Sequence, residues 1–374
     1  MKRMRRQQST TRRVGRVARA LLCAALAACE AAGAGRGAQP PSRPGRPVSA
    51  SAKFAYTGSN SAPKGAPIRV LGGDFLTPDG TGGAYIPAAA AISPGWGTPR
   101  SIYTGDDTPS PVPDRVTVSY FSYLEDKFYQ GEFALPRDSI ARLLAEEYPT
   151  QYGPTKRGRF DMLIAGMAPG GAVAVWLAGP ERHVEVFFGQ AQVADVDFHR
   201  ATGAPSGLDR RQFVADVLAE ESAADPLVDR YRQHFPVGLW AAYRTRYRWT
   251  PAFEGVPLPA QLDPLQYFNG ERGRQPVPFT AQVLAAGLPV PSYLAFDDRA
   301  AGLSYEITFD FDETAAALAR VGAAVQPGAG AGAPAELVFA KTPAGPARAE
   351  VRVRRGTESV TLRAAKVEVF RLRR

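Results

Sequence analysis

The chain has 374 residues, with 45 Lys and Arg against 36 Asp and Glu, a formal net charge of +9. Eight of the basic residues and none of the acidic ones lie in residues 1–28, so the remainder carries 37 basic and 36 acidic residues, a net charge of +1. Because strong polynucleotide binding needs an excess of positive surface charge, we expect no nucleic-acid partner.

The first residues have the pattern of an export signal. A basic start leads into a nine-residue apolar run over 20–28, which ends in the lipobox-like sequence Leu-Ala-Ala-Cys at Cys29. A membrane-spanning helix needs about 20 apolar residues, so the run predicts a cleaved lipoprotein signal peptide over residues 1–28. We expect lipid on Cys29 to attach the chain to a membrane.

The residue after Cys29 indicates in which membrane the lipoprotein is anchored. Glu30 stands where an aspartate would resemble an inner-membrane retention signal, which favours an outer-membrane lipoprotein facing the periplasm. The pair Arg12-Arg13 leaves a twin-arginine export route as an alternative. The other cysteine, Cys23, lies in the signal peptide, so the mature chain can form no internal disulfide.

Composition predicts the domain organisation. Residues 29–52 are mainly Ala, Gly, Pro, Arg and Ser, which predicts a lipidated flexible tether. We expect a main β-rich domain over 53–274 and a smaller, hairpin-rich part over 275–374, with a single continuous domain as the alternative.

The region 114–193 is dominated by strand patterns. Val116, Val118 and Tyr120 alternate with other residues in a strand that has apolar side chains on both faces. A second strand over 127–135 precedes a short helix capped by Asp138, with Ile140 among its apolar positions.

A meander and a helix follow. Two apolar runs within 162–178 meet at a Pro-Gly-Gly turn at Pro169, which predicts a hairpin. A third strand covers 183–193, with Val184, Val186 and Phe188 on one face. Asp209 with Gln212 then resembles a capping box at the start of a helix.

In the C-terminal part we expect a strand over 302–310, a helix over 313–321, and a one-faced hairpin that turns at Gly356 and runs through Val351, Val360 and Val367. The predicted fold class is α+β, predominantly antiparallel β-sheet with a few short covering helices.

No catalytic, cofactor or metal site is recognisable. The three histidines, His183, His199 and His234, lack a ligand spacing and read as surface or turn residues. Neither a G-x-S-x-G elbow nor a phosphate-loop lysine occurs. Asp310 and Asp312 form either a metal or acid–base site or the cap of a helix, and the cap is favoured.

Two aromatic and charged segments are candidate contacts for a protein partner. The first supplies Tyr123, Glu125, Asp126 and Tyr129, and the second supplies Tyr243, Arg246, Tyr247 and Trp249. The second segment also fits a half-buried strand whose arginines are solvated or paired with local acids, and this structural interpretation is favoured over partner contact.

Several motifs together resemble a known family. They are the lipobox, YFSYLEDKFY over 120–129, GMAPGG over 166–171 and Val-Trp-Leu at Trp176, followed by Tyr-Arg-Trp at 247–249 and Phe-Asn-Gly-Glu at 268–271. The chain from about Pro63 to its C-terminus resembles the bacterial lipoprotein family catalogued as domain of unknown function 2931. The resemblance implies a membrane-anchored, periplasm-facing protein and no catalytic residue.

The sequence therefore predicts a non-enzymatic lipoprotein that binds a protein partner in the periplasm. One form of this hypothesis is an immunity protein against a periplasm-delivered toxin such as a type VI secretion lipase. The alternatives are an envelope structural or assembly factor, and a hydrolase whose carboxylates assemble from distant segments.

Overall fold

We analysed a computed structural model of the chain. It describes residue 49 and residues 51–80, 83–102, 108–325, 332–342 and 349–372. The predicted signal peptide, Cys29 and nearly all of the predicted tether lie outside the described residues.

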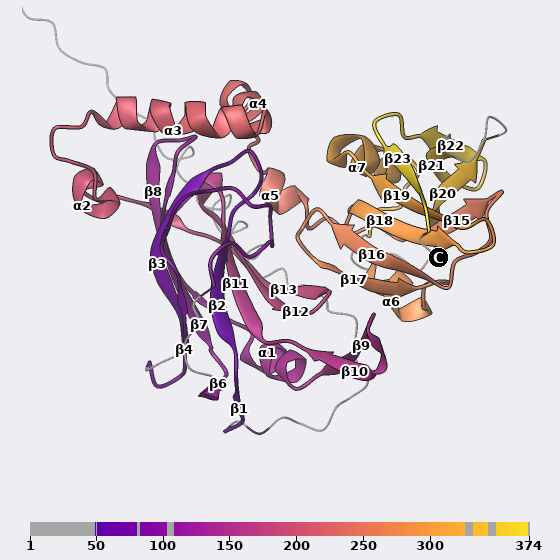
Figure 1. Ribbon diagram of the computed structural model, residues 1–374, viewed down its shortest axis with the longest axis horizontal. Helices are drawn as coiled ribbons and strands as arrows, with labels where there is room; N and C mark the ends of the chain where they lie inside the picture. The colour runs from indigo at the N-terminus through magenta and orange to yellow at the C-terminus, as the bar shows by residue number, and fades with distance from the viewer. Residues whose placement is uncertain are drawn as a thin grey trace, which may run out of the picture. The chain divides into compact units, whose positions relative to one another are not determined.

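A six-stranded antiparallel sheet forms one layer of the N-terminal part (Figure 1). Its order is β14-β8-β7-β3-β4, and β5 also pairs with β3. The strands are β3 (Ile68–Leu76), β4 (Gly83–Ile86), β5 (Ala89–Ile92), β7 (Arg115–Ser122), β8 (Lys127–Ala134) and β14 (Gln192–Ala194).

A nine-stranded sheet forms the opposing layer and continues into the C-terminal part, in the order β2-β11-β12-β13-β17-β16-β18-β19-β23. Only β2 and β11 pair in parallel. The strands are β2 (Thr57–Ser61), β11 (Met162–Met167), β12 (Ala172–Gly179), β13 (Arg182–Gln190), β16 (Gln261–Tyr267), β17 (Arg272–Pro276), β18 (Pro291–Asp298), β19 (Leu303–Thr308) and β23 (Lys366–Arg371).

The first hydrophobic core lies between these two layers. Val116 and Val118 of β7 face Leu163 of β11 and Val175 of β12, and all four side chains are buried. Alternate residues of β12 point the other way, so that Trp176 belongs to a separate cluster on the opposite face. Strands β11 and β12 are therefore buried on both faces, as their near-continuous apolar sequence requires.

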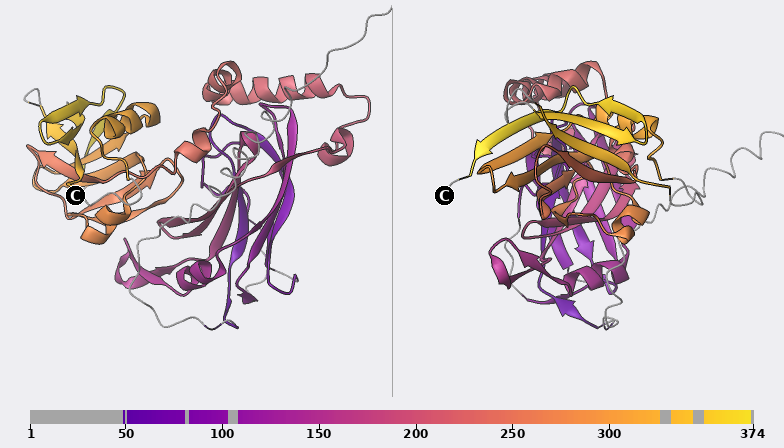
Figure 2. Two further views of the ribbon diagram at one scale, coloured as in Figure 1. Left: turned by 180° about the vertical axis from the view of Figure 1, so that it is seen from behind. Right: turned by 90° about the vertical axis from the view of Figure 1, so that its right-hand side faces the viewer.

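A second core fills the C-terminal part. It lies between strands β16, β18 and β19 and a four-stranded sheet in which β15 pairs with β20 in parallel, in the order β15-β20-β21-β22. These strands are β15 (Trp249–Glu254), β20 (Ala335–Lys341), β21 (Ala349–Arg355) and β22 (Glu358–Thr361). Figure 2 shows this part from two further directions.

Short helices cover the sheets. Phe121, Tyr123 and Phe128 pack under α2, α3 and α4, which lie together in Figure 1. The helices are α1 (Arg137–Leu144), α2 (Phe198–Thr202), α3 (Arg210–Ala224), α4 (Leu227–Gln233), α5 (Leu239–Ala242), α6 (Ala281–Ala286) and α7 (Phe311–Arg320). Within the described ranges, no helix is both long and apolar enough to cross a bilayer. The 3-10 turn η1 (Pro169–Gly171) and the short strand pairs β1 (Lys53–Phe54) with β6 (Ser110–Pro111) and β9 (Glu147–Thr150) with β10 (Gly153–Arg159) complete the fold.

The predicted fold class is confirmed, since the sheets are mostly antiparallel and the helices few and short. The hairpin over 162–178 is also confirmed: β11 pairs with β12 around η1. The prediction for Val184, Val186 and Phe188 is partly wrong. A bulge opposite Val175 and Trp176 shifts the register of β13, so Phe188 packs on the other face from Val184 and Val186.

Three other details differ from the sequence predictions. Helix α1 begins after Pro136, so Asp138 is a first-turn acid and not the cap. Asp209 caps α3, but Gln212 donates to Asp216 instead of completing a capping box. Residues 243–248 form no strand, because the turns that follow α5 lead directly into β15 at Trp249.

The C-terminal hairpin also differs from the prediction. Strand β22 pairs with β21 around Gly356, but β23, which contains Val367, crosses to pair with β19. The predicted boundary at 274/275 falls inside β17, which pairs with β16, and the second core already includes Trp249 and Leu262. The second core therefore has residues on both sides of this boundary.

Candidate functional site

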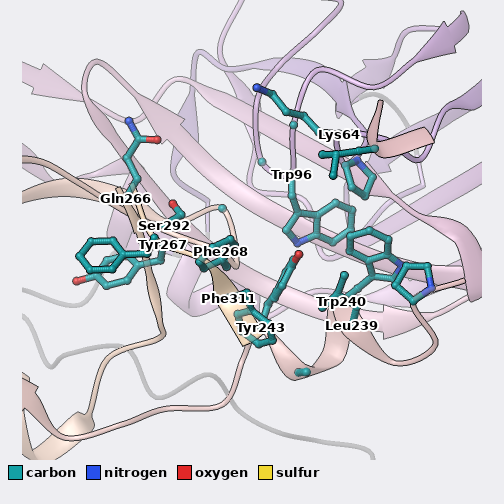
Figure 3. A pocket seen from close by; sticks show the side chains of 18 of the residues that line it. Lys64, Trp96, Leu239, Trp240, Tyr243, Gln266, Tyr267, Phe268, Ser292 and Phe311 are labelled. Carbon is teal, nitrogen blue, oxygen red and sulfur yellow. The ribbon is translucent and has the colours of Figure 1, made fainter. Parts of the chain in front are cut away.

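Eight Phe, Tyr and Trp residues line a cavity of about 1000 Å3, and five of them form one group. Figure 3 shows Trp96, Trp240, Tyr243, Phe268 and Phe311 gathered there. The ring centroids of Trp96 and Trp240 are 5.9 Å apart, and those of Tyr243 and Phe311 are 4.7 Å apart. Large aromatic surfaces around a concave space are typical of binding sites.

Four separate segments supply these rings. Trp96 lies in the loop after β5, Trp240 and Tyr243 lie in and just after α5, Phe268 follows β16, and Phe311 begins α7. The indole N–H groups of Trp96 and Trp240 are buried and donate to no acceptor among the described residues. The accessible surface that Trp96 and Trp240 offer to the cavity is therefore apolar.

Two glycines bring the Trp96 loop against the turn between β16 and β17. A Cβ atom on Gly97 would lie 2.9 Å from the carbonyl oxygen of Gly270, closer than real contacts allow, and Gly97 has a φ of +74°. Glycine is the residue that adopts this backbone conformation without steric cost. The close approach holds Trp96 edge-on to Trp176, with ring centroids 5.0 Å apart.

His183 lines the cavity and pairs with Arg272 where β13 joins β17 in the nine-stranded sheet. Its Nδ1 is 3.0 Å from the carbonyl oxygen of Gly97, and its Nε2 is 2.7 Å from Nη2 of Arg272. Burial, together with the charge of Arg272, lowers the pKa of His183 to about 3. The imidazole is therefore neutral, with Nδ1–H donating to the carbonyl and Nε2 accepting from the guanidinium.

A buried acid–base cluster lies two residues further along β13. Arg244 Nε donates to Glu185 Oε1 at 2.6 Å, and Asn269 Nδ2 donates to Glu185 Oε2 at 3.3 Å. The Arg244 guanidinium lies 3.5 Å from the ring centroid of Phe188. Burial raises the pKa of Glu185 to about 7, although the charge of Arg244 opposes the shift.

Glu271 ties the cluster to the turn between β16 and β17. Its Oε1 accepts from the backbone N–H of Glu185 at 3.3 Å, and its Oε2 lies 3.8 Å from Nη2 of Arg246. The backbone carbonyl of Asn269 accepts from Nε1 of Trp176 at 3.0 Å. These contacts connect β13, the turn and the segment after α5 through polar groups that are bonded to one another.

A second cavity, of about 390 Å3, shares part of its lining with the aromatic cavity. It shares His183, Tyr267, Glu271 and Arg272 with the aromatic cavity. Arg182, Arg246 and Arg274 also line it. The wall between the two cavities is therefore polar and contains both His183 and Arg272.

Asp310 and Asp312 border the aromatic cavity, and Asp310 has the structural role that the sequence favoured. Asp310 is the N-cap of α7 and accepts from the backbone N–H of Glu313 at 3.0 Å, while Asp312 lies in the first turn. In the part of the chain that the structure describes, no group of three or more His, Cys, Asp or Glu side chains could hold a metal ion.

The first predicted contact segment is the turn between β7 and β8. Tyr123 and Tyr129 are 1% and 4% exposed, so these rings are core residues and offer no contact surface. Glu125 accepts from Tyr129 Oη at 2.8 Å and from the backbone N–H of Gly170 at 2.7 Å. Asp126 pairs with Arg210 at 2.7 Å. The two acids are partly exposed, and their contact with a partner stays a prediction.

The second predicted contact segment is also largely internal. Tyr247 and Trp249 are buried in the second core, and Tyr243 is 8% exposed at the cavity. Arg246 donates to the carbonyl oxygen of Gly287 at 2.9 Å and approaches Glu271. The prediction of pairing with local acids is thus wrong, because Arg244 and Arg246 pair with Glu185 and Glu271, which are distant in sequence, and the segment is not a strand.

Sequence reasoning named Tyr243 but missed most of the other residues that make the site. It took His183 for a surface or turn residue, but the side chain is 4% exposed. His183 and Arg272 meet through the single residue pair that joins β13 to β17. No local pattern identifies such a pair, because it depends on the pairing of strands that are far apart in sequence.

The family comparison matches residues 39–225, which is half of the chain, to the model described as "Protein of unknown function (DUF2931)". The resemblance at 247–249 and 268–271 lies outside the matched region, so the expected extent to the C-terminus is not reproduced. Comparisons with curated proteins and with solved structures find no match. Because the match covers half of its residues, the chain belongs to the DUF2931 family.

Proposed function

We propose that this chain is an envelope lipoprotein that acts as a non-enzymatic binding module for a protein partner, with the aromatic cavity as the binding site. The observation that carries the proposal is the gathering of Trp96, Trp240, Tyr243, Phe268 and Phe311 around one cavity of about 1000 Å3. Aromatic residues in concave, desolvated sites contribute much of the binding energy in protein interfaces.

The polar groups beside the cavity favour binding over chemical turnover. Both ring nitrogens of His183 are hydrogen-bonded, and burial keeps the ring neutral. The carboxylate of Glu185 is bonded to Arg244 and Asn269. A general base must reach the proton that it removes, and these groups are instead engaged with one another.

The cellular location in this proposal is inferred from the N-terminal motif. Lipid on Cys29 would anchor the chain to the outer membrane, with the folded part in the periplasm. Replacing Cys29 by Ser should abolish incorporation of radiolabelled palmitate and release the chain from the membrane fraction. A Cys29→Ser variant that remains labelled and sediments with membranes would contradict the proposed anchor.

An immunity protein is one concrete form of such a module, because a protein that blocks a toxin needs a contact surface and no chemistry of its own. A toxin delivered into the periplasm, such as a type VI secretion lipase, would be its partner. This form draws on the proposed location and on the cavity.

A pull-down from detergent-solubilised envelopes tests the proposal, with the product of the neighbouring gene co-expressed as a candidate partner. The chain, a Trp240→Ala variant and a Tyr152→Ala variant serve as baits, and mass spectrometry identifies what they retain. Trp240 lines the cavity, whereas Tyr152 is 66% exposed on a different part of the surface. Thermal unfolding confirms that each bait is folded.

We expect a stoichiometric partner that is retained by the chain and by Tyr152→Ala and lost by Trp240→Ala. A secreted toxin as that partner would support immunity, and envelope machinery would favour an assembly factor instead. A partner that a folded Trp240→Ala variant still retains would remove the cavity from the proposal. Recovery of no partner would count against protein binding.

A further inference from the structure

Arg272 differs from the other arginines around the second cavity. Arg182 pairs with Glu146 at 2.5 Å, and Arg274 pairs with Asp263 at 2.8 Å. Arg246 has Glu271 at 3.8 Å. Among the described residues, no carboxylate lies within ion-pair distance of Arg272. Its Nη2 donates instead to the neutral ring of His183.

The position of Arg272 makes this lack of a counter-ion costly. Its Nε is buried without an acceptor among the described residues, and burial lowers the pKa of its guanidinium. A neutral imidazole accepts one hydrogen bond but cancels no charge. A partly desolvated cation is strongly stabilised by an anion that brings both charge and acceptor atoms.

The aromatic cavity places an apolar region beside this cation. Arg272 and Phe268 line the same cavity, together with Trp96 and Trp240, whose indole N–H groups are also without acceptors in the described part of the chain. A group bound there can place an apolar body against the rings while its oxygens accept from Arg272. The combination selects an anion attached to an apolar or aromatic body.

We propose that Arg272 binds the carboxylate or phosphate of a ligand whose apolar body occupies the aromatic cavity. This inference rests on the proposed binding function, because it assigns a ligand chemistry to the same cavity. The anionic group belongs either to an acidic side chain flanked by apolar residues on the partner or to a free amphiphilic anion. Both sources present the same chemistry to Arg272.

Three probes with one body and different head groups test the assignment. They are 4-phenylbutyrate, the neutral 4-phenylbutan-1-ol and the cationic 4-phenylbutylamine, titrated into the purified chain while tryptophan fluorescence and calorimetric heat are followed. Phenyl phosphate serves as the phosphate probe. Because a charge-assisted hydrogen bond contributes more than a neutral one, we expect the butyrate to bind about tenfold more tightly than the alcohol.

Two variants at Arg272 and one matched control complete the test. Arg272→Gln should bind the acid and the alcohol with equal affinity, and Arg272→Lys should keep part of the preference because it keeps the charge. Arg274→Gln, in the same strand, should keep the full preference because Arg274 faces its own carboxylates. Urea denaturation of each variant confirms folding, and Arg272→Lys keeps the test valid if Arg272→Gln does not fold.

The inference is overturned if the chain binds the alcohol as tightly as the acid, if it binds none of the probes, or if Arg272→Gln keeps the preference. If the probe titration fails while the pull-down remains sensitive to Trp240→Ala, the proposed specificity for an anion is rejected. The proposed protein-binding function is then retained. Native mass spectrometry of the chain isolated from envelopes distinguishes the sources, since a small anion adds a few hundred daltons at most and a partner adds a polypeptide.

Discussion

Two arginine–glutamate clusters in this protein have the same chemical groups, but the pKa of the glutamate shifts in opposite directions. Beside the cavity, Glu185 and Arg244 have side chains that are 11% and 19% exposed. On the four-stranded sheet, Glu254 lies between Arg352 and Arg354 with a side chain that is 39% exposed. Burial raises the pKa of Glu185, whereas hydrogen bonds from Arg352 and Arg354 lower the pKa of Glu254. Solvent exposure decides whether desolvation or hydrogen bonding to arginine dominates the pKa of the glutamate.

The comparison separates two roles for an ion pair. In the buried cluster, each charge needs the other because neither is well solvated, so that loss of one partner leaves an isolated charge in the interior. In the exposed cluster, water replaces a lost partner at little cost. The following changes should separate the clusters, from the largest expected effect to the smallest.

Replacing Arg244 by Met should produce the largest effect. It leaves Glu185 buried without its ion-pair partner and removes the guanidinium that lies over Phe188. We expect the free energy of unfolding in urea to fall by about 3 kcal/mol. Arg354→Met on the exposed sheet is the control and should shift the urea midpoint much less. Equal losses in the two variants would mean that burial does not distinguish the clusters.

Replacing Gly97 by Ala should disturb the close approach of the Trp96 loop to the turn between β16 and β17. Gly97 and Gly203 have φ values of +74° and +68°, but only at Gly97 would a Cβ meet another backbone segment. Gly203→Ala should therefore cost only about 1 kcal/mol for its left-handed backbone. Gly97→Ala should cost roughly 1–3 kcal/mol more, because the loops must move apart. Thermal unfolding of both variants measures the difference, and equal shifts would show that the contact with Gly270 is unimportant.

Stability should change with pH in opposite directions for Glu185 in the buried cluster and for Glu254 in the exposed cluster. The pKa of Glu185 is raised from 4.5 to about 7, so the folded state holds a proton that the unfolded state has lost. Its contribution is complete below pH 4.5 and is lost as the pH rises through about 7. Relative to Glu185→Gln, the wild-type chain should gain up to about 1.4 kcal/mol per unit of acidification in this window.

Urea titrations at half-unit pH steps would measure that difference. His183 supplies an internal contrast, because its pKa is lowered from 6.5 to about 3 and its contribution is lost as the pH falls below 6.5. Relative to His183→Gln, the wild-type chain should therefore lose stability on acidification. Parallel curves for the wild-type and variant chains would refute the shifted pKa of the residue that was replaced.

Replacing Glu254 by Gln should have the smallest effect. The pKa of Glu254 is lowered, so its contribution is present above pH 4.5 and is lost as the pH falls through the lower value of the folded state. The change in urea midpoint should be small at neutral pH and should shrink further in 1 M salt, because salt screens exposed charges. A loss that is as large as for Arg244→Met and insensitive to salt would contradict this interpretation.

Local patterns predicted the elements whose periodicity is clear. The strand through Val116 and Val118, the hairpin around Pro169 and the caps at Asp209 and Asp310 follow from neighbouring residues alone. The site does not. It depends on the pairing of His183 with Arg272 and on rings from segments that fold together only in three dimensions.

The aromatic segments also show why burial is hard to predict from alternation. Tyr247 and Trp249 have the spacing of an exposed recognition surface, yet both side chains are in the second core. A row of aromatic residues beside arginines has the same sequence pattern whether the rings face a partner or a second sheet. Only the position of the opposing strands β16, β18 and β19 separates the two cases.

The two parallel strand pairs have a consequence for the order of folding. Strand β2 pairs with β11, and β15 pairs with β20, across separations of 105 and 86 residues from Thr57 to Met162 and from Trp249 to Ala335. Contacts between distant segments form slowly, because the intervening chain must first be confined. During synthesis from the N-terminus, the first core can close once β11–β13 have emerged, while β15 has no parallel partner until β20 has emerged. We therefore expect a nascent chain to acquire protease resistance in two stages, with the aromatic cavity completed only in the second.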